Sequence, residues 1–355
     1  MGIQHLNAYF RKNATIKSIH KISLNDLNGK KVVIDASIYL YRFMTEGALL
    51  ENFYSMLSVF QHNNITPIFV FDGAAPPEKS QLLEKRCEDK NLAEQEYNKL
   101  KDELASTSYD DNKYGELCCD MILLKKQFIR IRRSDVAMVK RLITAFGVSY
   151  IEAEGEADAL CAKLVIKKQA FACLSEDMDL FIYGCPRVLR YLSLMNETAI
   201  IYYLDNILVD LAVTFKEFKE ICIISGTDYS HKTETQKTKK TEKTKKTEKT
   251  EKIKKTEKTK KTETNRPINL FTTFEYFKQY KDNNNEKGIN FYEWLEANTD
   301  YIANIYQLYS IFNLFGTDNV NLKKIKLDAT VKKLNMDEIK EIMIPEGFIF
   351  VKKTT

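Results

Sequence analysis

The stretch from residue 152 to residue 181 limits the possible folds of this chain, because acids flank one helix-length and one strand-length apolar run. A helix between parallel strands brings the strand ends to one edge of a sheet, where ligands commonly bind. Crowded carboxylates repel one another unless cations neutralise them, and oxygen ligands without His or Cys suit Mg²⁺ or Mn²⁺ rather than zinc. The stretch therefore predicts a metal-dependent phosphoryl-transfer site. Its acids are Glu152, Glu154, Glu156, Asp158, Glu176, Asp177 and Asp179.

Two earlier apolar runs also end in an aspartate. Residues 30–37, KKVVIDAS, predict a buried strand ending in Asp35, and residues 66–71, TPIFVF, predict a second strand followed by Asp72. A carboxylate at the end of a buried run needs a partner or an ion. Asp35 alternatively suits the N-cap of the helix that follows it. Acids at the ends of several strands are most simply explained by one shared edge of a sheet.

Composition predicts a globular protein, and its charge is unevenly distributed. The 355 residues are 44% hydrophobic, enough for one large domain or two smaller ones. The net charge is +5, but residues 231–264 hold 14 Lys against 6 Glu and contribute +8, which leaves −3 for the rest. Any basic binding surface on the folded part must therefore come from local clustering.

Cysteine usage and the absence of targeting signals predict a reducing intracellular compartment. The seven cysteines form no CxxC pair, and the four histidines are scattered, so structural zinc is not expected. The sequence contains no signal-peptide pattern and no apolar run of membrane length, so no membrane association is expected.

The elements around the acids alternate between helices and strands. Residues 78–134 are rich in charged helix formers, which predicts either solvated surface helices or a mobile cap facing a phosphate backbone. Ser134 is expected to cap a helix that Gly147 ends, and residues 148–151 to form a strand. Residues 188–194 and 199–204 predict a hairpin at the sheet edge. Thr214 and Glu217 form the capping-box pattern of a further helix.

The last third divides into a repeat and a helical region. Residues 231–264 repeat variants of KKTEKT without apolar periodicity, which predicts a disordered insert: either a neutral repeat expansion or an electrostatic tether for nucleic acid. The predicted organisation is a core over residues 1–230 that contains the cap, the insert, and a mostly helical region over 265–355 that packs on the core. The aromatic stripe at residues 271, 274, 277 and 280 belongs to that last region.

Over residues 1 to about 229 the chain resembles the flap endonuclease family of structure-specific 5′ nucleases. The resemblance rests on MGIQ, VVIDAS, VFDG, EGEAD, SEDMD and SGTDY. It implies an α/β fold of the PIN type: a central twisted, mostly parallel sheet flanked by helices, with a helical cap. It also implies that seven acids hold two Mg²⁺ ions, for which Mn²⁺ can substitute. Asp35, Asp72, Glu156 and Asp158 would serve one metal, and Asp177, Asp179 and Asp228 the other.

The resemblance also implies which groups contact the substrate. Lys79 and Arg86 match the two cap cations that contact the scissile phosphate, and Tyr41 matches an aromatic residue that stacks on a nearby base. Further expected substrate contacts are Gly2, Arg130, Arg132 and Arg133. The chain departs from the family after Tyr229, where the repeat replaces a glycine-containing helix-two-turn-helix that binds duplex DNA.

The expected function is magnesium-dependent cleavage of branched or 5′-ended DNA, as a flap endonuclease and 5′–3′ exonuclease in replication or repair. We expect a monomer acting in the nucleus or another site of DNA replication. A sliding clamp is a conceivable partner, but no convincing clamp-binding peptide is present. Two alternatives stay open: an RNA-directed 5′ nuclease of PIN-type fold, and a catalytically silent scaffold for branched nucleic acid.

Overall fold

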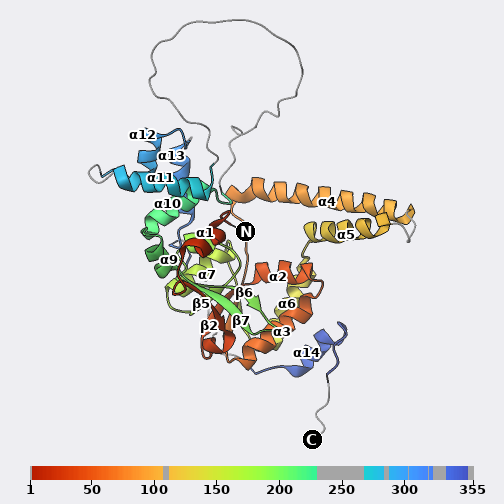
Figure 1. Cartoon of the computed structure of the whole chain (residues 1–355). Coiled ribbons are helices and arrows are strands. Elements are labelled where there is room, and N and C mark those ends of the chain that lie inside the picture. Colours follow the sequence, from red (N-terminus) through yellow and green to blue (C-terminus); the bar gives the residue numbers. More distant parts are fainter. Residues whose placement is uncertain are drawn as a thin grey trace, which may run out of the picture.

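A mixed sheet forms the centre of the computed structural model, which describes residues 2–106, 112–229, 268–283, 288–302, 304–318, 320–322 and 333–350 (Figure 1). In the described residues the strand order is β1-β7-β6-β5-β2-β3-β4. The strands β2 to β6 are parallel, and β7 is antiparallel to both β6 and β1. The strands are β1 Ile19–Ser23, β2 Lys31–Asp35, β3 Thr66–Phe71, β4 Tyr150–Glu152, β5 Ala172–Leu174, β6 Arg187–Ser193 and β7 Thr198–Tyr203.

Alternating side chains of the sheet enter two apolar cores. In β2, Val33 packs in one core while Val32 and Ile34 pack in the other, because successive side chains of a strand point to opposite faces. The first core is covered by α1 Leu6–Asn13, α7 Ala157–Ile166, α8 Asp179–Ile182, α9 Leu204–Asp210 and α10 Phe215–Ser225. The second is covered by α2 Ala36–Thr45, α3 Leu49–His62 and α6 Arg133–Ala145. This α/β arrangement confirms the predicted fold class.

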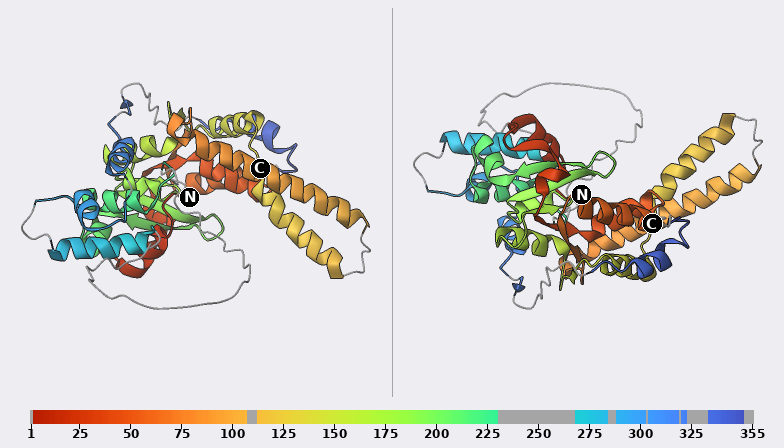
Figure 2. Two further views of the ribbon diagram at one scale, coloured as in Figure 1. Left: turned by 90° about the horizontal axis from the view of Figure 1, so that it is seen from above. Right: turned by 90° about the horizontal axis from the view of Figure 1, so that it is seen from below.

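Two long helices project away from the sheet as a pair (Figures 1 and 2). They are α4 Ser80–Ser106 and α5 Asn112–Gln127. At the end of the pair nearer the core, the rings of Tyr97 and Phe128 lie 5.4 Å apart and Arg130 pairs with Glu94 at 2.8 Å. Their position matches the expected cap, but its mobility stays a prediction.

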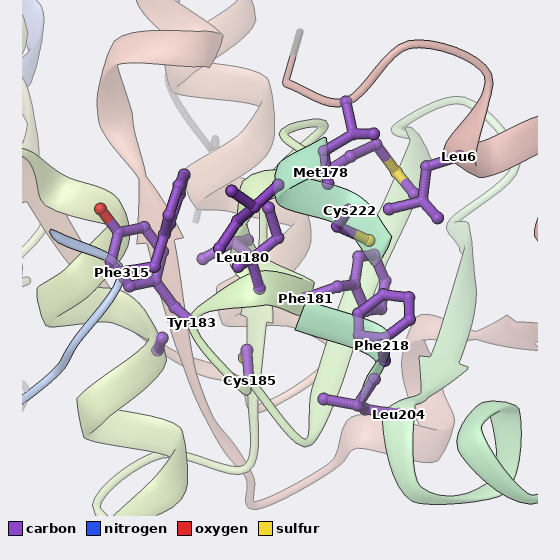
Figure 3. Close-up of a cluster of buried hydrophobic side chains, with 14 of the residues drawn as sticks. Leu6, Met178, Leu180, Phe181, Tyr183, Cys185, Leu204, Phe218, Cys222 and Phe315 are labelled. Carbon is purple, nitrogen blue, oxygen red and sulfur yellow. The ribbon is translucent and has the colours of Figure 1, made fainter. Parts of the chain in front are cut away.

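The C-terminal helices add to both cores. The first core receives α11 Leu270–Asn283, α12 Phe291–Asn298 and α13 Ile305–Leu314, and the second receives α14 Met336–Met343. Figure 3 shows Phe315, at the end of α13, beside Tyr183. In the aromatic stripe Phe274 and Phe277 are buried, whereas Phe271 is exposed. The insert at 231–264 lies outside the described residues, and the domain bounds stay a prediction.

Two local predictions are wrong. The hairpin of β6 and β7 does not lie at the sheet edge, because β1 pairs along β7 and takes that place. The strand β1 was not predicted because its sequence, IHKIS, is short and lacks the alternation of apolar and polar residues that marks a strand. Ser134 does not cap α6, which begins one residue earlier at Arg133. There the Asp135 side chain accepts the backbone N–H of Arg132 at 2.8 Å. Thr214 and Glu217 do form the predicted capping box of α10.

Candidate functional site

The predicted acids gather where the parallel strands end. Because β2, β3, β4 and β5 run in the same direction, their carboxyl ends meet at one edge of the sheet. We call this the acid edge and define it by seven residues. Asp35 ends β2, Asp72 follows β3, Glu156 and Asp158 lie at the start of α7, Asp177 and Asp179 follow β5, and Asp228 follows α10.

Asp35 is both a helix cap and a member of the acid edge. Its Oδ1 accepts the backbone N–H of Ser37 at 3.2 Å, which caps α2, and its Oδ2 accepts the Ser175 hydroxyl at 2.9 Å. The two alternatives weighed for Asp35 are therefore compatible. Asp72 accepts the N–H of Ala157 at 2.8 Å, so it stabilises the N-terminus of α7 next to Glu156 and Asp158.

A hydrogen-bonded turn holds the acids after β5. The Ser175 hydroxyl accepts the N–H of Asp177 at 3.1 Å, and Asp177 Oδ1 accepts the N–H of Asp179 at 2.9 Å. Gly2 closes this turn from the other side, because a Cβ there would overlap the Oδ1 atoms of Asp177 and Asp179. Gly2 also has a φ of +74°, which L side chains rarely adopt. The site therefore requires glycine at position 2.

The electrostatics of the acid edge favour bound cations. Burial, with Asp72 and Asp177 nearby, raises the pKa of Asp35 to about 7. Burial and then the neighbouring acids raise the pKa of Asp158 and of Asp179 well above the ordinary value. The Oδ1 atoms of these two are buried without a hydrogen-bond partner in the described part of the chain. Buried oxygens without donors fit a hard divalent cation, which would supply the missing positive charge.

Two basic side chains of the cap region already contact the acid edge. Lys79 is buried, and its Nζ lies 2.6 Å from Glu156 Oε1 and 3.9 Å from Asp228 Oδ2. Burial acts to lower the pKa of Lys79, but the Glu156 and Asp228 carboxylates raise it overall. Arg86, on α4, donates to Asp228 Oδ2 at 2.9 Å. In the described ranges, no group of three or more His, Cys, Asp or Glu side chains is arranged to hold a metal ion. The ion pairs with Lys79 and Arg86 occupy two of the acids, Glu156 and Asp228.

The other expected substrate contacts lie apart from the acids. Tyr41 on α2 is exposed, with Lys90 Nζ 5.0 Å from its ring centroid. Arg130 donates to Asn91 and Glu94, and Arg132 and Arg133 are exposed at the start of α6. Among the described residues, no hydrogen bond or ion pair joins these three arginines to the acid edge.

The remaining acids of the central stretch are held by other partners, and several contacting groups were not predicted. Glu152 pairs with Lys140 at 2.6 Å, and Glu176 pairs with the buried Arg190 at 3.4 Å.

The hydrogen bonds of Ser175 and Tyr229 to the acids were not predicted from the sequence. Ser175 and Tyr229 adjoin predicted acids in the sequence, but that position alone does not reveal their hydrogen bonds.

The raised pKa of Asp35 predicts a pH-dependent stability of the metal-free protein. The pKa of Asp35 is about 7 in the fold and near 3.8 in the unfolded chain. Such a group stabilises the fold fully at pH values below 3.8, and this stabilisation is lost as the pH rises through about 7. The Tm of Asp35→Asn minus that of wild type should therefore increase between pH 5 and pH 8 in chelator. Calorimetry at matched ionic strength tests this, and a constant difference would contradict it.

Two regions of the chain match known protein families. A model of the XPG N-terminal domain matches residues 1–93, and a model of the XPG I-region matches residues 147–228. Flap endonuclease 1 of Lodderomyces elongisporus is 32% identical over 250 residues, which are 64% of this chain and 61% of that protein. The chain is similar to flap endonucleases, and both XPG regions are present in it. It spans about three fifths of the length of its curated flap endonuclease relatives.

Solved structures have the same fold as this chain. The catalytic core of Rad2 in complex with DNA substrate superposes with a TM-score of 0.61 at 16% identity, covering 98% of this chain and 96% of that one. Flap endonuclease-1 from Methanococcus jannaschii gives a TM-score of 0.56 at 22% identity, covering 97% and 93%. In the described residues, no helix is both long and apolar enough to cross a membrane.

Proposed function

We propose that this protein is a metal-dependent, structure-specific 5′ nuclease that hydrolyses DNA phosphodiester bonds at 5′ flaps and from 5′ ends. The observation that carries the proposal is the acid edge itself. It combines buried carboxylate oxygens that have no hydrogen-bond partner among the described residues with two cations, Lys79 and Arg86, that reach it from the cap region. Such a site can hold both metal ions and a phosphate.

The chemistry divides between the metal and the chain. Bound magnesium supplies a Lewis acid for the phosphate and lowers the pKa of a bound water. The residues that would hold it are the seven acids, with Asp158 and Asp179 offering their free Oδ1 atoms. When substrate binds, Lys79 would leave Glu156 and Arg86 would leave Asp228 to contact the phosphate. There the two side chains neutralise the negative charge that develops on the phosphate. The mechanism requires no nucleophilic side chain.

The cap and the N-terminal segment provide a route for substrate to the acid edge. A cavity of about 440 Å³ lies beside it, lined in part by the backbone of Gly2, by Arg86 and Arg190, and by Asp228. Tyr41 with Lys90 forms a ring-and-cation surface at the base of the cap, suited to base stacking next to a phosphate. We propose branched or 5′-ended DNA as the partner and a site of DNA replication, such as the nucleus, as the location.

Matched substrates test the proposed function. The purified protein would be incubated with 5′-labelled flap, nicked, gapped and single-stranded DNA, and with flaps made of RNA, in magnesium or in chelator. We expect magnesium-dependent cleavage near the junction of the DNA flap and weaker cleavage of single strands. Preferential cleavage of RNA flaps would support the RNA-directed alternative. Tight flap binding without cleavage in any divalent cation would support the scaffold.

A further inference from the structure

Tyr229 connects the acid edge with the C-terminal helices. It directly follows Asp228 and is buried, with only 5% of its surface exposed. Its hydroxyl donates to Glu156 Oε2 at 2.6 Å. Its ring lies beneath Lys79, whose Nζ is 4.7 Å from the ring centroid. Because Lys79 Nζ also contacts Glu156 Oε1 at 2.6 Å, both oxygens of this carboxylate are held, and Tyr229 touches both members of the pair.

The Tyr229 ring also contacts a residue from the C-terminal region. Phe315 lies edge-on to Tyr229 with centroids 5.2 Å apart, and it also contacts Tyr183 at 5.1 Å (Figure 3). Phe315 is buried, so the Tyr229 ring contacts both Lys79 and a residue of the C-terminal part of the core.

Two lysines of the core fix the backbone around Phe315. The buried Lys219, on α10, donates to the Phe315 carbonyl at 2.9 Å, and Lys163, on α7, donates to the Thr317 carbonyl at 2.6 Å. The helix α7 also carries Asp158 and begins next to Glu156. The segment that braces Tyr229 is therefore fixed to the helix that presents two acids of the edge. Both family models end at or before residue 228, so neither covers Tyr229 or Phe315.

We propose that Tyr229 is a positioning residue of the nuclease, and that the C-terminal region sets its position through Phe315. The inference rests on the proposed function, because it assigns Glu156 to metal binding and Lys79 to the phosphate. The Tyr229 hydroxyl orients Glu156 by holding one oxygen, as the hydrogen-bond partners of metal-ligating carboxylates commonly do. The Tyr229 ring holds the ammonium group of Lys79 beside the acids through a cation–π contact.

Two substitutions separate the hydroxyl from the ring. Tyr229→Phe keeps the ring beneath Lys79 and against Phe315, and removes the bond to Glu156. It should raise the half-saturating Mn²⁺ concentration, measured by calorimetry, about 10- to 100-fold, while the cleavage rate at saturating metal falls less. Tyr229→Leu removes both contacts, so it should also lower the single-turnover rate at saturating metal. Flap affinity at saturating Ca²⁺ should stay near wild type for both.

The control is Tyr292→Phe, which removes another buried hydroxyl, bonded to the Glu220 carbonyl at 3.3 Å in the C-terminal part of the same core. We expect it to change thermal stability alone. The positioning role is overturned if Tyr229→Phe binds Mn²⁺ like wild type, or if it only lowers the Tm as the control does. Phe315→Leu should reproduce part of the Tyr229→Leu rate loss, and a wild-type rate would remove the C-terminal region from the proposal. Absence of cleavage by wild type would refute the proposed function instead, while the Mn²⁺ titration still tests Tyr229.

Discussion

Asp179→Asn is expected to abolish flap cleavage, by about a thousandfold or more, while leaving flap binding largely intact. Asp179 is only 3% exposed, and its Oδ1 has no hydrogen-bond partner among the described residues. The N–H of this residue bonds to Asp177 and would stay in place, so the change removes a charge rather than a shape. Binding should persist because many cations of the cap and core contribute to substrate affinity.

The same substitution should not destabilise the metal-free protein. Burial and the repulsion of Asp177 and Asp228 raise the pKa of Asp179 well above its ordinary value, so its charged form is costly in the fold. The measurements are single-turnover cleavage in Mg²⁺, flap affinity in Ca²⁺ and Tm in chelator. Glu152→Gln is the matched control, because Glu152 is exposed and pairs with Lys140 instead. Cleavage by Asp179→Asn at the control rate would contradict the assignment, and early melting would make Asp179 structural.

Lys79→Met is expected to lower the single-turnover cleavage rate about 10²- to 10³-fold, with a much smaller effect on flap affinity. Lys79 is 7% exposed and reaches Glu156 and Asp228, so its ammonium group lies where the phosphate charge would develop. Methionine keeps the length and the apolar stem. A group that meets charge in the transition state affects rate more than binding.

Lys85→Met is the matched control for Lys79→Met. Lys85 is an exposed cation on α4, beside Arg86 in the sequence, so it represents general attraction to phosphate. Its removal should weaken flap binding slightly at low salt and leave the rate at saturating substrate unchanged. Equal losses of rate and affinity in Lys79→Met would show that Lys79 is only a phosphate contact.

The sheet and the convergence of the acids could be predicted because they follow from local patterns. Short apolar runs ending in Asp35 and Asp72 define buried strands, and parallel connections bring their ends together. The fully buried Cys161 and Cys173 also lie in the predicted apolar segments. The edge strand β1 was missed because its two isoleucines, Ile19 and Ile22, lie three residues apart and so do not alternate as in a half-buried strand.

The contacts that tune the site could not be predicted, because they join residues distant in the sequence. Ser175 bonds to Asp35 across 140 positions, and Phe315 reaches Tyr229 from beyond the insert. Lys79 lies in a charge-rich segment that resembles a solvated helix, and only the fold reveals that it is buried against Glu156. Which acid serves which metal stays a prediction from the family resemblance.

The most direct test of the central claim is the single-turnover cleavage rate of a 5′-labelled DNA flap against Mg²⁺ concentration, starting from chelator. We predict no product in chelator, and a rate that rises more steeply than in proportion to Mg²⁺ before it saturates, because two ions act together. Cleavage at the same junction in chelator would contradict the account. So would a magnesium response that Asp179→Asn leaves unchanged.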